Sequence, residues 1–285
     1  MNRKWCVNIP RIPADTSIGQ VSLEVSSLAK SRTFYQTICG LTVHDRFSDR
    51  IVLGNASDTL LTLHKGGSRV QLNTAEAGLF HLAIRVSDRA ALSERLETIE
   101  MNGELIGASD HGVSEALYLR DPDDNGVEIY CDRPKADWPR NRDGTVEIPS
   151  YPLDLSAVRS TVSQSGSHPL DIGHIHLNVT DLDHSKRFYR ETVGFPIQFE
   201  DPSGAVFFGA GDYHHHVAIN RWHNRGQPYS KTGMKWFEIV VTSQQTLAAL
   251  TDRLEDADIP VEPTQSGIEF HDPDNIPIRC LVGKR

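Results

Sequence analysis

The stretch IGQVSLEVSSLAKSRTFYQTICGL, residues 18–41, decides the fold because the chain repeats it as IGHIHLNVTDLDHSKRFYRETVGF at residues 172–195. Each copy opens with alternating apolar residues, which predict a strand. Ser or Asp residues able to cap a helix follow, and the next segment carries a Phe-Tyr pair and stops at a glycine. The same strand–helix unit is therefore predicted twice.

A second pair of repeats extends the pattern. GLFHLAIRVSDRAALSERLETIEMNG, residues 78–103, resembles GMKWFEIVVTSQQTLAALTDRLEDAD, residues 233–258. Both continue into strand–turn–strand endings around DPDDN and DPDN, whose residues accept turn dihedrals. The chain thus holds four units, numbered 1 to 4 in sequence order, each a strand, a helix and several strands. One unit leaves the open face of a curled sheet uncovered, so two units should pair into a cup with a cavity.

The repeats also predict domain boundaries. We expect a first domain at residues 17–132 (units 1 and 2) and a second at residues 171–283 (units 3 and 4). Residues 133–170 between them are rich in proline and then in serine, which favours a linker.

Composition excludes several classes of function. A formal net charge of -9 without a dense basic run argues against a nucleic-acid or anionic-membrane partner. No segment approaches the ~18 consecutive apolar residues of a membrane helix, and the N-terminus lacks an apolar signal-peptide core, so we expect a cytoplasmic protein. The four cysteines have no CxxC spacing and are expected to be reduced thiols: Cys6, Cys39, Cys131 and Cys280.

Polar residues inside apolar strands are candidates for a site. His81 lies among Leu, Ala and Ile in the first strand of unit 2, and Glu128 lies in its last strand, VEIY. His174 and His176 open unit 3 and share one face, because strand side chains alternate. Taken singly, a strand histidine is more often a hydrogen-bonded, half-buried residue than a ligand.

Comparison of the copies sharpens this choice. For His81, Glu128 and His174, the equivalent positions in the other copies hold Trp236, Arg279 and Gln20. The copies that diverged kept a His-Glu pair in unit 2 and a His in unit 3, with poorer ligands elsewhere. Two neutral imidazoles and one carboxylate with open positions are what a mononuclear Fe(II) or Mn(II) site of the facial-triad type requires. These three residues are therefore the predicted metal ligands.

The units resemble the βαβββ modules of the vicinal oxygen chelate superfamily, which includes glyoxalases, fosfomycin-resistance proteins and extradiol dioxygenases. LFHLAIRV, DHGVSEALYLRDPDDNGVEIYCDRP, IGHIHLNV and GDYHHHVAIN together resemble the two-domain catechol 2,3-dioxygenases. The resemblance implies an α+β fold of four βαβββ modules paired into two barrel-like domains. It also implies a homo-oligomer that uses Fe(II), with Mn(II) as the alternative, and O2 to cleave catechol or a substituted catechol into a 2-hydroxymuconic semialdehyde-type product.

This sequence departs from the family pattern in one respect. In many two-domain extradiol enzymes all three ligands come from modules 3 and 4, but module 4 here has Trp236 and Arg279 at those places. The predicted metal set requires modules 2 and 3 to pair in one barrel and modules 1 and 4 in the other, which we favour. When modules 1 and 2 pair instead, the set becomes Gln20, His81 and Glu128, which is more like a glyoxalase site.

The resemblance also assigns catalytic residues. His215 matches a histidine in an H-x-V-A stretch of extradiol enzymes and would stabilise bound dioxygen and act as an acid-base group in ring opening. Tyr118 and His111 match a Tyr and a His suited to stabilise the diol anion and accept its protons. His214 and His216 are expected to face solvent or the cavity mouth. The remaining histidines are expected at the surface: His64, His168, His184, His223 and His271.

Two alternative functions stay open at this point. A metal-dependent isomerase or thiol transferase of the glyoxalase or fosfomycin type predicts Ni, Zn or Mn, an extra carboxylate ligand and no oxygen uptake. A non-catalytic ligand-binding member of the superfamily predicts no metal, and the preserved His-Glu-His set argues against it.

Overall fold

The computed structural model describes residues 11–66, 75–161, 170–230 and 233–283. Within these residues the strands form two curled sheets, of eight and nine strands. The first sheet combines unit 4 with unit 1. Its strands, in spatial order, are β15 (Glu262–Pro263), β16 (Gly267–His271), β17 (Pro277–Val282), β14 (Met234–Val241), β1 (Ser17–Val25), β4 (Thr59–Lys65), β3 (Arg50–Gly54) and β2 (Thr42–Arg46).

The second sheet combines unit 3 with unit 2 and carries the candidate site. Its strands, in spatial order, are β11 (Ile197–Asp201), β12 (Ala205–Phe208), β13 (Val217–Asn220), β10 (Leu170–Asn178), β5 (Gly78–Val86), β8 (Gly126–Asp132), β7 (Ser114–Arg120), β6 (Gly107–Asp110) and β9 (Tyr151–Pro152). Each sheet is joined in its middle by an antiparallel pair: β1 with β14, and β10 with β5. Strands from the two halves of the sequence therefore lie side by side in both sheets.

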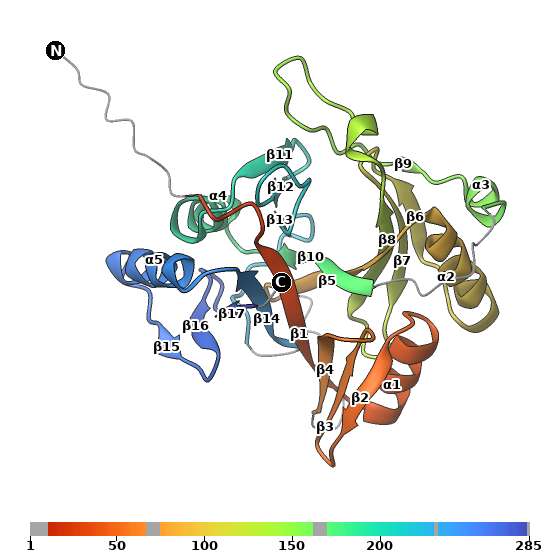
Figure 1. Cartoon of the computed structure of the whole chain (residues 1–285), viewed down its shortest axis with the longest axis horizontal. Helices are drawn as coiled ribbons and strands as arrows, with labels where there is room; N and C mark the ends of the chain where they lie inside the picture. Colours follow the sequence, from red (N-terminus) through yellow and green to blue (C-terminus); the bar gives the residue numbers. More distant parts are fainter. Residues whose placement is uncertain (1–10, 67–74, 162–169, 231–232, 284–285) are drawn as a thin grey trace.

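The helices lie on the outside of the curled sheets (Figure 1). They are α1 (Leu28–Thr37), α2 (Arg89–Asn102), α3 (Leu155–Arg159), α4 (Leu182–Arg187), which continues as a π-helical turn η2 (Phe188–Val193), and α5 (Gln244–Asp256), with a 3-10 turn η1 (Lys135–Asp137). The N-cap side chains of Ser27 and Asp181 accept backbone N–H groups of the first turn, as their types predict. Gly194 ends η2 with a φ of 97°, a value that favours glycine.

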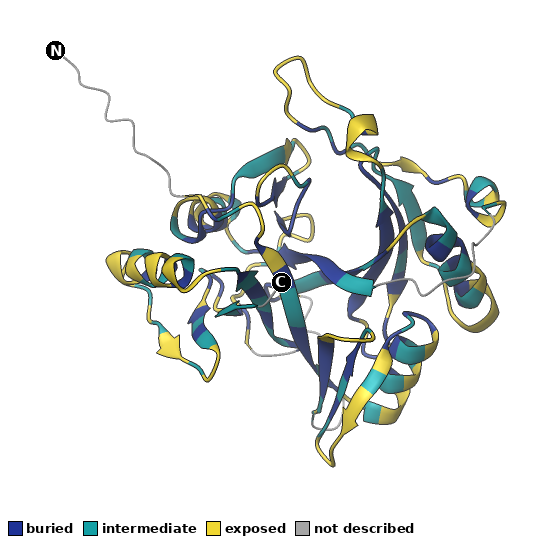
Figure 2. Cartoon of the chain, in the orientation of Figure 1, coloured by how far each residue is buried: buried dark blue, intermediate teal, exposed yellow. Residues whose placement is uncertain are grey.

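The core lies between the helices and the sheets, where Figure 2 shows the strands largely buried and the outer helix faces exposed. Leu92, Leu96 and Ile99 of α2 are each fully buried and are spaced to share one helix face. Burial of one such side chain contributes about 1.5–3 kcal/mol to folding. Through this face α2 packs on β5 and β8 of the second sheet.

The tyrosines of the repeated Phe-Tyr pairs connect sequence-adjacent units. The Tyr35 hydroxyl donates to Asp121 in the turn of unit 2 (2.9 Å), and the Tyr189 hydroxyl donates to Asp272 in the turn of unit 4 (3.0 Å). Both aspartates also accept backbone N–H groups inside their own turns. The repeated tyrosine and aspartate therefore form hydrogen bonds that join the two sheets.

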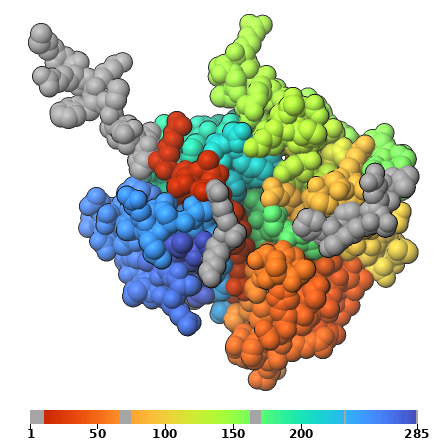
Figure 3. Space-filling view, in the orientation of Figure 1, coloured from red at the N-terminus to blue at the C-terminus, as the bar shows by residue number. Residues whose placement is uncertain are grey.

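The described part of segment 133–170 packs against the second sheet. Trp138 is buried, β9 pairs with β6, and α3 packs on α2. Between η1 and β9 the chain makes an excursion, yellow-green in Figure 3, that projects from the body of the molecule. The segment predicted as a linker thus forms part of the wall around the second sheet.

Two further sequence predictions concern cysteines and membranes. Cys39, Cys131 and Cys280 are buried free thiols, and Cys6 lies outside the described residues. In the described part of the chain, no helix combines the length and apolar character that crossing a bilayer requires.

Candidate metal centre

Three adjacent strands of the second sheet bring His81, Glu128 and His174 together. β10 lies next to β5, which lies next to β8, so each strand contributes one of the three residues. In the register, His174 and Glu128 both lie opposite Ala83, one on each side of β5. Because strand side chains alternate between faces, the three side chains project to the same face. All three are buried, with at most 6% of each residue exposed.

The donor atoms of this group fit a divalent metal ion. Glu128 Oε2 lies 2.9 Å from His81 Nε2 and 3.2 Å from His174 Nε2, and the two imidazole nitrogens are 3.2 Å apart. Neighbouring ligands of an octahedral metal with bonds of about 2.1 Å are separated by roughly 3 Å. The three atoms therefore have the mutual spacing of one face of an octahedron, and the group could hold a metal ion.

The charge state of the group also suits a metal. Burial alone would raise the pKa of Glu128, but His174 and His81 outweigh it and hold that pKa well below its usual range. Burial lowers the pKa of His174 to about 4, against the opposing effect of Glu128. An ionised carboxylate beside a neutral imidazole is the form in which both bind metal ions.

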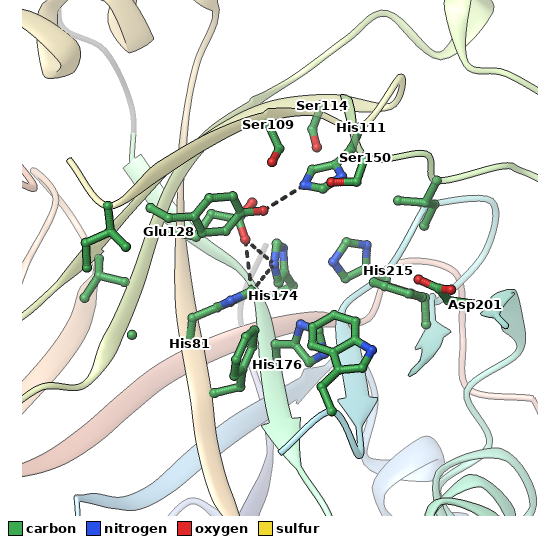
Figure 4. A pocket seen from close by; sticks show the side chains of 18 of the residues that line it. His81, Ser109, His111, Ser114, Glu128, Ser150, His174, His176, Asp201 and His215 are labelled. Atoms are coloured by element: carbon green, nitrogen blue, oxygen red, sulfur yellow. Dashed lines mark hydrogen bonds and ion pairs between the residues drawn. The ribbon is translucent and has the colours of Figure 1, made fainter. Parts of the chain in front are cut away.

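The three donors line a cavity of about 470 Å³, and Figure 4 shows them facing one another there. The cavity falls in the range of small-molecule sites, roughly 300–1,000 Å³. One wall is aromatic: the ring of Phe80 lies 5.4 Å from that of Trp222 and 5.0 Å from that of His176. Ile148 and Ser150, from the segment predicted as a linker, also line the cavity.

Tyr118 and His111 form a hydrogen-bonded pair in the same cavity. The Tyr118 hydroxyl lies 2.7 Å from His111 Nε2, and His111 Nδ1 lies 2.8 Å from the carbonyl oxygen of Pro149. Because a carbonyl only accepts, His111 Nδ1 carries a proton, and Nε2 of the neutral ring accepts from Tyr118. Burial, reinforced by Glu128, raises the pKa of Tyr118 well above its usual value, so the phenol keeps its proton.

His215 lines the cavity beside the donor set, and Figure 4 places it on a different side from His111. Its ring centroid is 4.1 Å from that of His174. Burial, together with the neighbouring imidazoles, lowers the pKa of His215 well below its usual value. The structure therefore brings all six residues singled out from the sequence into one cavity.

The predicted exposure of His214 and His216 is wrong. His214 is fully buried and lies 2.8 Å from Asp132, and His216 is 8% exposed with its Nδ1 accepting the backbone N–H of Ala210. The prediction assumed a regular strand through the three histidines, but β13 begins only at Val217. The alternation of a strand therefore does not apply to them.

Family membership follows from comparison with known proteins. Residues 17–129 and 171–279 match the family model of the Glyoxalase/Bleomycin resistance protein/Dioxygenase superfamily. The chain belongs to this superfamily. The predicted family and the predicted α+β fold of repeated modules are thereby confirmed.

Relatives within the superfamily differ in activity. The chain is 36% identical over 272 residues to a catechol-2,3-dioxygenase of Bacillus subtilis, covering 92% of this chain and 95% of the relative. It is 30% identical over 116 residues to the glutathione transferase FosA of Serratia marcescens, covering 40% of this chain and 79% of the relative.

Solved structures of the superfamily show the same fold. A putative dioxygenase from B. subtilis superposes with a TM-score of 0.69 at 12% identity, covering 96% of this chain and 87% of that one. Glyoxalase I from Zea mays superposes with a TM-score of 0.58 at 15% identity, covering 94% and 92%. At these identities the likeness concerns the fold.

Sequence patterns assigned no role to several residues in and around the cavity of this superfamily member. The sequence predicted that His176 shares a strand face with His174. In the structure His176 also contacts the ring of Trp222, which lies on an exposed loop after β13. Asp132 was not singled out, because nothing local in the sequence connects it with His214. Of the histidines expected at the surface, His168 lies outside the described residues and His64 is half-buried. The others are exposed: His184, His223 and His271.

Proposed function

We propose that this chain is an extradiol ring-cleaving dioxygenase that acts on catechol or a substituted catechol. The ring carbon–carbon bond next to the diol breaks and both atoms of O2 enter the product, a 2-hydroxymuconic semialdehyde, so no external reductant is required. The observation that carries the proposal is the presence of a facial His-Glu-His donor set and two acid-base elements in one cavity. The catechol-2,3-dioxygenase relative, matched along 92% of the chain, supports it.

The metal proposed for the donor set is Fe(II), with Mn(II) as the alternative. The residues that would hold it are His81, Glu128 and His174. When bound, a divalent iron would supply open coordination positions for the diol and for dioxygen and the redox activity that dioxygen chemistry needs. The remaining steps depend on the side chains of the cavity.

Tyr118 is suited to stabilise the diol anion. Burial keeps the phenol protonated, and in the free cavity its one proton is donated to His111 Nε2 at 2.7 Å. As that proton passes to His111, the Tyr118 oxygen can take the proton of a diol hydroxyl and then donate it as a hydrogen bond to the diol anion. The pair thus divides the roles expected from the sequence: Tyr118 stabilises charge, and His111 supplies basicity.

His215 is suited to acid-base work on the reacting oxygens. It is neutral, lines the cavity and is not a member of the donor set. A positioned imidazole of this kind contributes about 10²- to 10⁴-fold to the rate of a reaction that needs proton transfer. The aromatic wall of Phe80 and Trp222 offers apolar contact to the ring of the substrate.

A glyoxalase-type metal-dependent isomerase or thiol transferase is the second candidate, since one relative is the glutathione transferase FosA. That branch was expected to use an additional carboxylate ligand. Among the described residues, the His, Cys, Asp and Glu group arranged for a metal contains Glu128 as its single carboxylate. This donor set favours the dioxygenase.

Oxygen consumption tests the proposal directly. The chain, loaded anaerobically with Fe(II) and given catechol, should take up one O2 per catechol and form a yellow semialdehyde. Parallel samples loaded with Ni(II), Zn(II) or Mn(II) receive fosfomycin together with glutathione, or a glutathione–methylglyoxal adduct. Tight iron binding without oxygen uptake on catechol or its alkyl and aryl derivatives would overturn the proposal, and turnover of a glutathione substrate would replace it.

A further inference from the structure

A chain of hydrogen bonds runs from the cavity into the wall of the second sheet. His215 Nδ1 lies 2.7 Å from His214 Nδ1, and His214 Nε2 lies 2.8 Å from Asp132 Oδ1. Both ring nitrogens of the fully buried His214 are therefore engaged, one by a carboxylate and one by His215. Hydrogen bonds to both nitrogens fix which of them carries a proton.

Asp132 is held as an ionised acceptor. Arg85 Nη1 lies 3.0 Å from Asp132 Oδ2, and the Tyr213 hydroxyl lies 3.2 and 3.1 Å from its two oxygens. Burial would raise the pKa of this carboxyl, but His214 and Arg85 together lower it below the usual value. An ionised carboxylate can only accept, so the proton between Asp132 and His214 belongs to His214 Nε2.

The proton on His214 Nε2 determines the proton on the next ring. When this is the only proton on the His214 ring, the other nitrogen, Nδ1, is an acceptor, and His215 supplies the proton of the 2.7 Å contact from its own Nδ1. His215 Nε2 is left with a free lone pair at the edge of the cavity that His215 lines. The carboxylate thus sets the tautomer of a ring that it does not touch.

We propose that Asp132 and His214 are positioning residues that fix His215 in the Nδ1–H tautomer, so that its Nε2 meets the substrate as a hydrogen-bond acceptor. The catalytic consequence rests on the proposed function. His215 begins the cycle as a base: a diol hydroxyl gives its proton to Nε2, the oxygen keeps the electron pair, and the imidazolium can return that proton later. The tautomer itself does not depend on which reaction the cavity performs.

Tautomers can be observed directly by NMR. In long-range ¹H–¹⁵N spectra, the protonated and unprotonated ring nitrogens of a neutral histidine have distinct shifts. The full chain is labelled with ¹⁵N-histidine in metal-free form, and the His215 signals are assigned by their loss in His215→Gln. We expect Nδ1–H in the wild type. An Nε2–H tautomer in the wild-type chain would overturn the proposal regardless of activity.

Asp132→Asn tests the cause, because an amide can donate to His214 Nε2 and reverse both tautomers. His215 should shift to the Nε2–H form, with kcat lowered by about 10²- to 10⁴-fold and KM little changed. The matched control is Tyr213→Phe, which removes the hydroxyl bonded to Asp132 and keeps the ring that packs on His214. It should keep both the tautomer and kcat.

The two readouts separate this proposal from the proposed function. An Nδ1–H tautomer that reverses in Asp132→Asn supports the positioning role even when the wild type shows no oxygen uptake on catechols. An unchanged tautomer in Asp132→Asn overturns the role even when the wild type is an active dioxygenase. Equal loss of kcat in Asp132→Asn and Tyr213→Phe would likewise overturn it, since both variants would then act through packing.

Discussion

The three adjacent histidines at positions 214–216 allow a sharp test of the proposed chemistry, because the structure gives each a different environment. His215 lines the cavity, whereas His214 and His216 are bonded within the wall. We predict that His215→Gln lowers kcat by about 10²- to 10⁴-fold, which corresponds to roughly 2.7–5.4 kcal/mol of transition-state stabilisation. Iron content should be unchanged, because His215 is not one of the three donors.

The structure also predicts how substitutions of His215 change the free energy of unfolding. His215→Ala leaves the fully buried His214 Nδ1 without its partner, and an unpaired buried polar atom costs about 1–3 kcal/mol. His215→Gln should lose less stability, because its amide can still donate to that nitrogen. Similar losses of kcat in the two variants, with different losses of unfolding free energy, would separate the chemical role of the imidazole from its structural one.

Steady-state oxygen uptake, iron content by mass spectrometry and urea denaturation together give these three quantities. His216→Gln is the matched control, since His216 is a buried neighbour whose polar contact is the backbone N–H of Ala210 at 3.0 Å. It should retain kcat close to the wild type. Full activity of His215→Gln, or loss of iron from it, would refute the assignment of His215 as an acid-base group outside the donor set.

Three further predictions follow from the same geometry. Alanine substitution of each of the three donors should abolish iron binding measured by mass spectrometry, whereas Gln20→Ala, in the other sheet, should keep it. Tyr118→Phe removes the hydroxyl proposed to donate to the diol anion and should lower kcat in oxygen uptake by about 10²-fold while leaving iron content unchanged. Burial raises the pKa of Asp272 to about 7, so the folded state holds this proton where the unfolded chain has lost it. The stability of Asp272→Asn relative to the wild type should therefore rise between about pH 4 and pH 7 and level off above, as measured by urea denaturation at several pH values.

Much of the fold could be predicted because its signals are local and repeated. Alternating apolar residues specified β1 and β10, and Ser27 and Asp181 marked the starts of α1 and α4. The comparison of copies also singled out His81, whose neighbours alone would have suggested an ordinary core histidine. The repeated units allowed equivalent strand positions to be compared within one chain. That comparison showed which copies hold a residue able to bind a metal and which do not.

The parts that could not be predicted depend on contacts without a local signature. Asp132 and His214 are far apart in sequence and meet because β8 and the approach to β13 lie in the same curled sheet. The segment after Asp132 is rich in proline and serine, which normally indicates a solvated linker, yet it buries Trp138 and places Ile148 in the cavity lining. Composition indicates the structure that a segment favours in isolation. Its burial also depends on the apolar surface that other segments present to it.

In the first sheet, Trp236 and Arg279 occupy the positions equivalent to the candidate ligands His81 and Glu128. In its register Trp236 lies opposite Ser22, as His81 lies opposite His176 in the second sheet. The guanidinium of Arg279 lies 4.0 Å from the centre of the Trp236 ring, at the position equivalent to Glu128. Arg279, which is paired with Glu269 at 2.7 Å, thus stands where a metal would need a carboxylate, and a guanidinium has no lone pair with which to bind a cation. The repeated units thus place a candidate donor set in the second sheet and a cation–aromatic pair at the equivalent positions of the first sheet.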